Sequence, residues 1–380
     1  MSETVMIVAG ETSGELYGAL LASSLRLKKP DLNIIGIGGQ RMKEAGVSLI
    51  AGISSAFGFV EAISSIRDLK KIFNKAVDAL IKDRPSVLVL IDYPDFNLKL
   101  AEKAKSLNIK VLYYVSPQVW VWRKKRIYKI ARLVDKMAVI LPFEEKIYTD
   151  IGLDCEFVGH PVLDELQGLS MQKESIKQEL GLSTGAPLLA LLPGSRPNEI
   201  DRLLPIMSDV IREFRQEFRE FQFCVPFAPN TDMERYRNVI GLLKQEGVVI
   251  NQGKSVQVLA ASDCAVVASG TASLQSVLLG VPIVVIYKVS PLTYWIGRMI
   301  LKGKYMALAN ILSGREVVKE FLQTDVSATN VMTELRRIMT DNRYKLEMLD
   351  AYDRIKAMFS GRQASDMVSE MVIQMAGWQR

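Results

Sequence analysis

The residues best suited to chemistry stand directly after short apolar runs of the sequence. Asp92 follows the run Val87–Ile91, and Asp95 comes soon after it. A carboxylate that is partly buried at the end of a strand can have a raised pKa and serve as a general base. Asp95 is well placed to cap the helix predicted after it, which makes Asp92 the candidate base. The alternative is that both acids only cap the helix and turn the chain.

A glycine-rich loop, Gly10–Glu15, follows the run Val5–Ala9. Glycines let the backbone turn sharply and approach a ligand, and a helix that starts there offers its N–H groups to an anion. The spacing matches neither the GxGxxG motif nor a Walker loop. The loop is therefore either a ligand-binding turn or an ordinary strand-to-helix turn with Ser13 as the cap.

Two loops in the second half of the chain suit a phosphate. Gly194–Arg196 follows the run Leu188–Leu192, and its guanidinium can form two hydrogen bonds with one phosphate. Ser269–Thr271 follows Cys264–Val267 and opens a predicted helix whose N–H groups and hydroxyls also suit a phosphate. Two such loops in one domain favour a diphosphate ligand.

Aromatic and basic residues gather after the run Val111–Val115. Trp120 and Trp122 precede a basic cluster formed by Arg123, Lys124, Lys125, Arg126, Lys129 and Arg132. The cluster is either a solvated helix face or a surface that binds anions or lipid headgroups with aromatic anchors. Nucleic acid is disfavoured, because the formal net charge of the whole chain is only +6.

The cysteine and histidine content argues against a metal centre. The three cysteines, Cys155, Cys224 and Cys264, have no CxxC spacing, and His160 is the only histidine. A zinc site or a disulfide framework is therefore not expected, and a reducing compartment fits. A lone histidine is more often structural than catalytic, although His160 stands near the predicted domain junction.

These loops require strands before them and helices after them. Continuous apolar runs of about five residues suit strands buried on both faces, as in a parallel sheet. The runs are Val5–Ala9, Ile34–Ile37, Val87–Ile91, Val111–Val115 and Met137–Ile140 in the first half, and Leu188–Leu192, Phe221–Val225, Val248–Ile250, Cys264–Val267 and Ile283–Tyr287 in the second.

The alternation of these runs with helical segments such as Asp95–Leu107 predicts two doubly wound α/β domains, both Rossmann-like, that face each other across a cleft. The polar segment Asp164–Pro187 places the boundary near residue 166, and only helices are expected after about Asp325. A length of 380 residues agrees with two domains. With 49% hydrophobic and 24% charged residues, the composition is that of a soluble globular protein. Neither a signal peptide nor a membrane-spanning segment is predicted.

Eight motifs of the chain, taken together and in order, resemble those of the lipid-A-disaccharide synthase family. They are Gly10–Gly14, Asp92–Asn97, Tyr114–Pro117 with Val119–Arg123, Leu141–Glu144, Gly159–Pro161, Leu192–Arg196, Ser269–Ala272 and Ser313–Val318. The resemblance implies an inverting glycosyltransferase of the GT-B fold that needs no metal and no cofactor. Such an enzyme transfers 2,3-diacylglucosamine from UDP-2,3-diacylglucosamine to 2,3-diacylglucosamine 1-phosphate. The products are the β-1,6-linked lipid A disaccharide 1-phosphate and UDP.

The resemblance also implies roles for the two domains. An N-terminal domain, 1–166, would bind the acceptor, helices at about 350–380 would cross back to it, and a C-terminal domain, 167–349, would bind the UDP-sugar. Asp92 would be the catalytic base. Acceptor-binding residues would be Glu11, Ser13, Gly14, Trp122 and Arg123. UDP-binding residues would be Gly194, Ser195, Arg196, Ser269, Gly270, Thr271, Gln275, Asn310 and Arg315.

The chain departs from the family pattern at two positions. Gln275 stands where an acid usually faces the ribose, and it can still take part in a hydrogen bond without the added strength of a charge. Glu15 stands where the first loop usually ends in aspartate, and its longer side chain places the carboxylate differently. No catalytic role is assigned to Glu15.

The family's reaction in lipid A biosynthesis implies a cytoplasmic protein at the surface of the Gram-negative inner membrane, and it allows a homodimer. Phe59, Ile63 and Ile66 fall at helical spacing with Arg67, Lys70 and Lys71 at their edge. This pattern predicts a membrane or acyl-chain contact, and the alternative is an ordinary amphipathic helix packed on the sheet.

Two other functions remain open from the sequence. A UDP-sugar 2-epimerase shares the fold, although its chemistry normally uses further acid and base residues. A two-lobed binding protein would usually carry an export signal. Release of UDP that depends on a lipid acceptor would separate the three functions.

Overall fold

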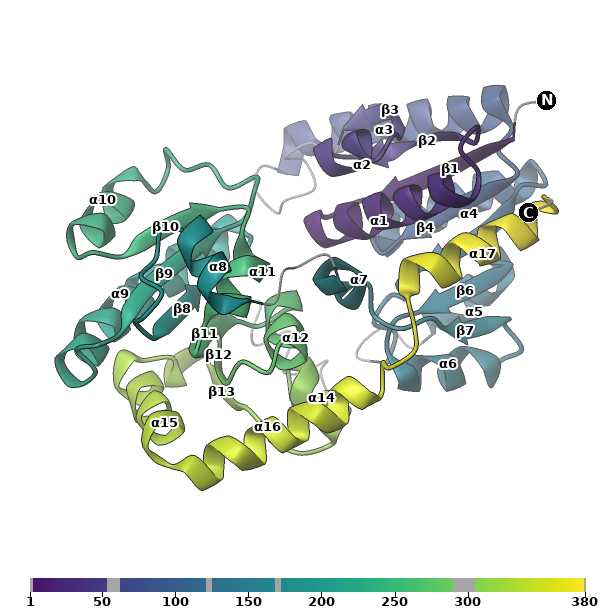
Figure 1. Cartoon of the computed structure of the whole chain (residues 1–380). Helices are drawn as coiled ribbons and strands as arrows, with labels where there is room; N and C mark the ends of the chain where they lie inside the picture. Colours follow the sequence, from purple (N-terminus) through teal and green to yellow (C-terminus); the bar gives the residue numbers. More distant parts are fainter. Residues whose placement is uncertain (1–2, 53–61, 121–124, 168–171, 290–304, 379–380) are drawn as a thin grey trace. The chain divides into compact units, whose positions relative to one another are not determined.

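The computed structural model describes residues 3–52, 62–120, 125–167, 172–289 and 305–378. The chain divides into two compact units, each built around a parallel sheet (Figure 1). Unit 1 comprises Met1–Gln167 and Phe359–Arg380, and unit 2 comprises Gly168–Met358. The predicted fold class, two Rossmann-like α/β domains, is confirmed.

Unit 1 has a seven-stranded sheet in the order β3-β2-β1-β4-β5-β6-β7. Its strands are β1 (Thr4–Ala9), β2 (Asn33–Gly38), β3 (Ser48–Gly52), β4 (Val87–Ile91), β5 (Lys110–Tyr114), β6 (Lys136–Val139) and β7 (Cys155–Phe157). Its helices are α1 (Thr12–Lys28), α2 (Gln40–Glu44), α3 (Ala62–Asp83), α4 (Pro94–Ser106), α5 (Arg126–Leu133), α6 (Pro142–Thr149), α7 (Val162–Gln167) and α17 (Ala364–Ala376). Every residue of β1 and β4 is buried, as expected for strands with helices on both faces.

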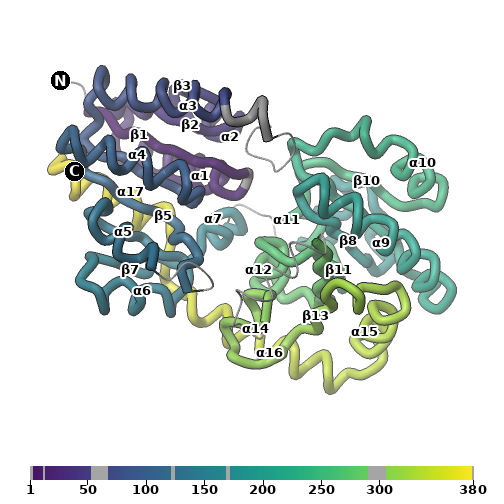
Figure 2. The backbone as a smooth tube through the Cα atoms, turned by 180° about the vertical axis from the view of Figure 1, so that it is seen from behind, coloured from purple at the N-terminus to yellow at the C-terminus, as the bar shows by residue number. Residues whose placement is uncertain are grey.

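The last helix of the chain completes unit 1. Helix α17 packs against α1 and against strands β4 and β5, while α3, α4 and α5 form a separate row of contacting helices (Figures 1 and 2). Ser24 of α1 donates a hydrogen bond to Ser369 of α17 at 3.0 Å, and Lys28 forms an ion pair with Asp366 at 2.7 Å. The two ends of the described chain are therefore parts of one domain.

Unit 2 has a six-stranded parallel sheet in the order β10-β9-β8-β11-β12-β13. Its strands are β8 (Leu188–Leu192), β9 (Gln222–Phe227), β10 (Val249–Gln252), β11 (Cys264–Ala268), β12 (Ile283–Tyr287) and β13 (Lys319–Leu322). Its helices are α8 (Lys173–Glu179), α9 (Pro197–Glu217), α10 (Arg237–Gln245), α11 (Ser255–Ala261), α12 (Thr271–Leu278), α14 (Leu308–Ser313), the 3-10 turn η2 (Gln323–Asp325), α15 (Ala328–Thr340) and α16 (Asn342–Ala357).

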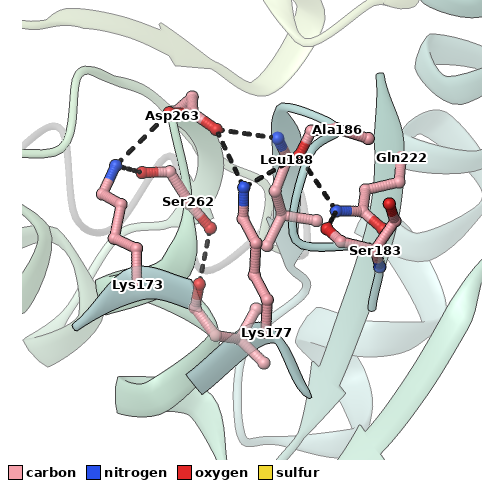
Figure 3. A network of polar contacts seen from close by, with 9 residues as sticks. Lys173, Lys177, Ser183, Ala186, Leu188, Gln222, Ser262 and Asp263 are labelled. Atoms are coloured by element: carbon pink, nitrogen blue, oxygen red, sulfur yellow. Dashed lines mark hydrogen bonds and ion pairs between the residues drawn. The ribbon is translucent and has the colours of Figure 1, made fainter. Parts of the chain in front are cut away.

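A polar network fixes the beginning of unit 2 to the amino ends of its strands (Figure 3). Asp263, just before β11, accepts a hydrogen bond from the N–H of Leu188 at 2.9 Å. The buried Lys177 of α8 donates to the carbonyl of Ala186 at 2.8 Å, and Gln222 donates to the same carbonyl at 3.1 Å. The segment that leads into β8 is thus held at the amino ends of the strands, whereas the predicted ligand loops follow the carboxyl ends.

All ten predicted strands form, and three of them, Val87–Ile91, Leu188–Leu192 and Ile283–Tyr287, have the predicted bounds. The structure adds β3, β7 and β13, which the apolar pattern did not predict. Each of these three lies at the edge of its sheet.

Candidate functional site

The glycine-rich loop and the Asp92 loop of unit 1 lie at the point where the strand order of the sheet reverses. Strands β1 and β4 are neighbours, with Ala9 opposite Ile91, and the chain leaves them in opposite directions. The two loops touch, because a Cβ atom built on Gly10 would lie 2.5 Å from Cγ of Tyr93. Gly14 packs more loosely, with a Cβ position 3.4 Å from Cγ2 of Ile91. Ligands of open α/β sheets bind at such switch points.

Asp92 is held in an unusual backbone conformation. Its φ is +49° and that of Tyr93 is +42°, in the left-handed region that residues other than glycine rarely adopt. Tyr113 and Asn97 donate hydrogen bonds to the carbonyl of Asp92, at 2.6 Å and 2.7 Å, and the N–H of Asp92 donates to Tyr114 at 3.2 Å. The N–H and the carbonyl of Asp92 are thus both hydrogen-bonded, so the turn is rigid. The half-buried carboxylate of Asp92 projects from this turn at the switch point.

Asp95 does not cap α4, contrary to the prediction. The N-cap residue is Tyr93, Pro94 follows it, and no side chain caps the helix. Asp95 lies within the first turn, exposed, and pairs with Arg126 of α5 at 2.5 Å. The helix begins at Pro94, directly after the two left-handed residues Asp92 and Tyr93. Asp95 therefore lies inside the helix and cannot be its N-cap.

The predicted acceptor residues Glu11 and Ser13 begin α1. Glu11 holds the N-cap position without a side-chain cap bond, so Ser13 lies inside the first turn and is not the cap. The pKa of Tyr93 is raised by burial and by the nearby carboxylates of Asp95 and Glu11. The side chain of Glu11 is therefore close to the turn formed by Asp92 and Tyr93.

Glu15 has a structural role. Its buried carboxylate accepts a hydrogen bond from the N–H of Arg41 at 2.9 Å, in the first turn of α2. A Cβ atom on Gly39 would lie 2.3 Å from its Oε1 atom. The longer side chain at this position is used to cap a neighbouring helix.

Glu144 is a buried carboxylate that the sequence reasoning did not select. It accepts hydrogen bonds from the indole of Trp120 at 3.1 Å and from the N–H of Leu141 at 3.2 Å. Burial raises the pKa of Glu144 to about 7, although these hydrogen bonds oppose the rise. Glu144 was present in the quoted motif Leu141–Glu144, but nothing in the pattern indicated its contact with Trp120. Trp122 and Arg123 lie outside the described residues, so their acceptor role stays a prediction.

The only histidine is structural. His160 is buried, and burial lowers its pKa to about 3. Its Nδ1 atom accepts a hydrogen bond from the N–H of Val162 at 3.2 Å, and its ring packs edge-on against Tyr17 and Phe359. It is neutral at physiological pH and joins α1 to the returning C-terminal segment within unit 1.

The two loops of unit 2 that are predicted to bind phosphate also lie at a switch point, because they follow the neighbouring strands β8 and β11. Gly194 has a φ of +104°, and a Cβ atom there would lie 2.4 Å from Oε2 of Glu199. The N–H groups of Ser195 and Arg196 both donate to that oxygen at 3.3 Å, and Nη1 of Arg196 lies 3.4 Å from Oε1. The side chain of Arg196 is 62% exposed.

The second loop places Gly270 at the N-cap of α12, with a φ of +148° and no neighbour near its Cβ position. Ser269 and Thr271 are half-buried beside it, and the N–H of Ser269 donates to Ile286 of the sheet at 3.1 Å. Gln275 is only 7% exposed, so it belongs to the buried side of α12 and not to its surface.

Asn310, which the family resemblance assigns to UDP binding, is held by hydrogen bonds within unit 2, and its contact with UDP stays a prediction. It is fully buried, and its side-chain oxygen Oδ1 accepts hydrogen bonds from the N–H groups of Val317 and Val318 at 2.6 Å and 3.0 Å. Its amide donates to Glu320 and to the carbonyl of Val318. These hydrogen bonds shape the loop that carries the exposed Arg315.

No group of three or more histidine, cysteine, aspartate or glutamate side chains could hold a metal ion within the described ranges. The three cysteines are buried and unpaired, and burial raises the pKa of each thiol. They are unreactive in the folded chain.

The predicted membrane segment is described only in part. Phe59 and the side chains of Ile63 and Ile66 lie outside the described residues. Farther along α3, Arg67, Lys70 and Lys71 are exposed, while Ile72, Ala76 and Leu80 are buried. The later part of the helix therefore packs on unit 1. Among the helices of the described ranges, none has both the length and the hydrophobicity needed to span a bilayer.

Comparison with known sequences gives matches along almost the whole chain. The family model described as lipid-A-disaccharide synthetase matches residues 5–372. A lipid-A-disaccharide synthase of Myxococcus xanthus is 39% identical over 375 residues, which cover 98% of this chain and 97% of the relative. One of Coxiella burnetii is 37% identical over 373 residues and 98% of each chain.

Comparison with solved structures supports the fold alone, because the identities are low. A co-structure of S. aureus MnaA with UDP has a TM-score of 0.70 at 11% identity and covers 99% of this chain and 98% of that one. The UDP-GlcNAc 2-epimerase of Neisseria meningitidis bound to UDP-GlcNAc has a TM-score of 0.65 at 12% identity, with 98% and 100% covered. The glycotransferase of kitacinnamycin has a TM-score of 0.65 at 14% identity, with 98% and 99% covered.

Proposed function

The chain belongs to the lipid-A-disaccharide synthetase family, and from this premise we propose how its own residues carry out the reaction. Its activity is that of its curated relatives, a glycosyl transfer in lipid A biosynthesis. The donor is UDP-diacylglucosamine and the acceptor is diacylglucosamine 1-phosphate. Unit 1 binds the acceptor and unit 2 binds the donor.

Asp92 is the general base that removes the proton of the acceptor hydroxyl as this oxygen attacks the anomeric carbon of the donor. The observation that carries this assignment is the rigid left-handed turn of Asp92 at the switch point of unit 1. Strained backbone conformations that several hydrogen bonds maintain are typical of active sites, because they fix the direction of a reactive side chain. Glu11, Ser13 and Gly14 border the same turn and contact the acceptor.

The leaving UDP is bound by the two phosphate loops of unit 2. Arg196 supplies an exposed guanidinium after β8, and Ser269, Gly270 and Thr271 supply the start of α12. Donors fixed in advance toward a developing negative charge stabilise a leaving group without a metal. Gln275 lies one turn along α12 from Thr271, and we assign it a contact with the ribose of UDP. Arg315 lies farther along the chain, and we assign it a supporting contact with UDP.

Both substrates carry acyl chains, so the protein works at the cytoplasmic surface of the inner membrane. The beginning of α3 supports this proposal through its exposed Arg67, Lys70 and Lys71, which suit anionic headgroups. Phe59, Ile63 and Ile66 are proposed as the apolar contact with the membrane or with an acyl chain. A homodimer is compatible with the proposal and is not required by it.

The test is the replacement Asp92→Asn, which keeps the size of the side chain and removes its basicity. Transfer should fall by about 10²–10⁴-fold, the usual contribution of a general base. UDP affinity, measured by calorimetry, should stay within twofold, because unit 2 is unchanged.

Asp95→Asn is the matched control, since Asp95 is an exposed acid three residues farther along, in the first turn of α4. It should keep most of the activity. Retention of more than a tenth of the turnover by Asp92→Asn would refute the base assignment. Conversion of the donor into an epimeric UDP-sugar would instead indicate an epimerase, the function that several fold neighbours have by name.

A further inference from the structure

The phosphate loop Gly194–Arg196 already binds an anion that belongs to the chain itself. One oxygen of Glu199 accepts hydrogen bonds from the N–H groups of Ser195 and Arg196, and the other lies near the guanidinium of Arg196. The glycine at position 194 makes room for this carboxylate, because a Cβ atom there would come within 2.4 Å of it. The donors expected to hold a phosphate therefore hold a carboxylate in the described structure.

A carboxylate oxygen and a phosphate oxygen compete for such donors. Both are negatively charged and accept charge-assisted hydrogen bonds. Because an N–H group forms a strong hydrogen bond with only one acceptor at a time, one of the two oxygens excludes the other. The three contacts of Glu199 measure 3.3–3.4 Å, beyond the usual range for N–H···O bonds. The carboxylate is therefore weakly held, while the guanidinium of Arg196 remains mostly exposed.

We propose that Glu199 is an internal anion that UDP must displace from the loop Gly194–Arg196. This inference rests on the proposed function of the loop as the diphosphate site. Because the carboxylate competes with the diphosphate and repels it, Glu199 weakens the binding of UDP and speeds the release of this product. The acid at this position thus favours turnover at the expense of affinity.

The test compares Glu199→Gln with the parent protein and with Glu213→Gln, an exposed acid of the same helix. Glutamine keeps the side-chain length and one oxygen for the loop N–H groups but removes the charge. UDP should bind Glu199→Gln about tenfold more tightly by calorimetry, with a slower dissociation in stopped-flow measurements. Glu213→Gln should match the parent, and the affinity for uridine, which has no phosphate, should not change in any variant.

Two further variants separate the possible failures. Arg196→Ala should weaken UDP binding at least tenfold; if it does not, the loop is not the diphosphate site and the proposed function fails there. Glu199 is also the third residue of α9 and accepts the N–H of its N-cap residue, Arg196. If Arg196→Ala weakens binding while Glu199→Gln leaves it equal or weaker, Glu199 only caps this helix and the present inference is wrong. Glu199→Asp, which shortens the side chain by one methylene, should give an intermediate gain in UDP affinity, and it replaces Glu199→Gln if that variant does not fold.

Discussion

Glu144 is a carboxylate that the folded chain protonates more readily than the unfolded chain does. Burial beside Trp120 raises its pKa to about 7, whereas an unfolded glutamate titrates near 4.3. Between these two values the folded state binds a proton that the unfolded state has released. The free energy of unfolding therefore falls as the pH rises through this interval and is constant above it.

Replacing Glu144 with glutamine should remove this pH dependence. Relative to the variant, the parent should lose up to about 3–4 kcal/mol of unfolding free energy between about pH 4.3 and 7. Denaturant unfolding at several pH values measures the difference, and the titration of His160 cancels because both proteins contain it. Glu102→Gln, at an exposed position, is the control. Parallel curves for parent and Glu144→Gln would contradict the raised pKa.

The sequence was sufficient to select side chains suited to catalysis or ligand binding. It was not sufficient to predict which of these side chains are buried. The loops with Asp92, Arg196 and Gly270 were predicted from their places after apolar runs, and the structure puts them at strand ends. Asn310 was assigned to UDP binding because the stretch around it resembles that part of the family. In the structure its side-chain oxygen accepts the N–H groups of Val317 and Val318, and no spacing rule indicates such a pairing within a loop.

The elements around the candidate base store strain at the ends of two neighbouring strands. Asp92 and Tyr93 after β4 have positive φ, and so does Val115 after β5, with a φ of +66°. A β-branched residue in that region is a genuine outlier. The hydrogen bonds from Asn97 and Tyr113 maintain the first turn, so the geometry of the site depends on α4 and β5 as well as on Asp92 itself.

The contact between the two loops can be tested with Gly10→Ala. The added methyl group would overlap the ring of Tyr93 and displace the turn that carries Asp92. Transfer should fall by about 10²-fold, because a displacement of about 1 Å at a catalytic group has this effect. UDP affinity should be unaffected.

Gly52→Ala is the matched control, since a Cβ atom on Gly52 meets nothing within 4 Å. Equal activities of the two variants would mean that the loops do not depend on each other.

Strands were predicted well at the centre of each sheet and poorly at the edges. Central strands such as β4 and β8 are fully buried and therefore apolar at every position. The missed strands β3, β7 and β13 lie at edges, and β3 and β13 consist of half-buried and exposed residues. Without a neighbour on one side they need no continuous apolar run, so the pattern used for prediction is absent from them.

The whole chain is arranged so that its last helix supports its first domain. Helix α17 places Val368, Met371 and Val372 in the core of unit 1, against α1, β4 and β5. Strand β4 carries the candidate base at its end. The stability of unit 1 therefore depends on residues that are remote in sequence from its other elements.

Val372→Asp should destabilise unit 1 by about 3–5 kcal/mol, the usual cost of a buried charge without a partner. Hydrogen exchange should show faster exchange in β4, β5 and α1, while the strands of unit 2 keep their protection. Gln374→Asp, at an exposed position on the same helix, is the control and should have little effect. Equal protection of β4 in both variants would argue that α17 is dispensable for unit 1.

The return of the chain to unit 1 has a consequence for its synthesis. A ribosome releases the chain from its N-terminus, so β1, α1, β4 and β5 emerge long before Ala364–Ala376 does. During that interval unit 2 can complete its own fold, because Gly168–Met358 contains all of its strands. Unit 1 is thus completed only when α17 has emerged, and until then the apolar face that α17 covers is exposed to wrong contacts with other surfaces.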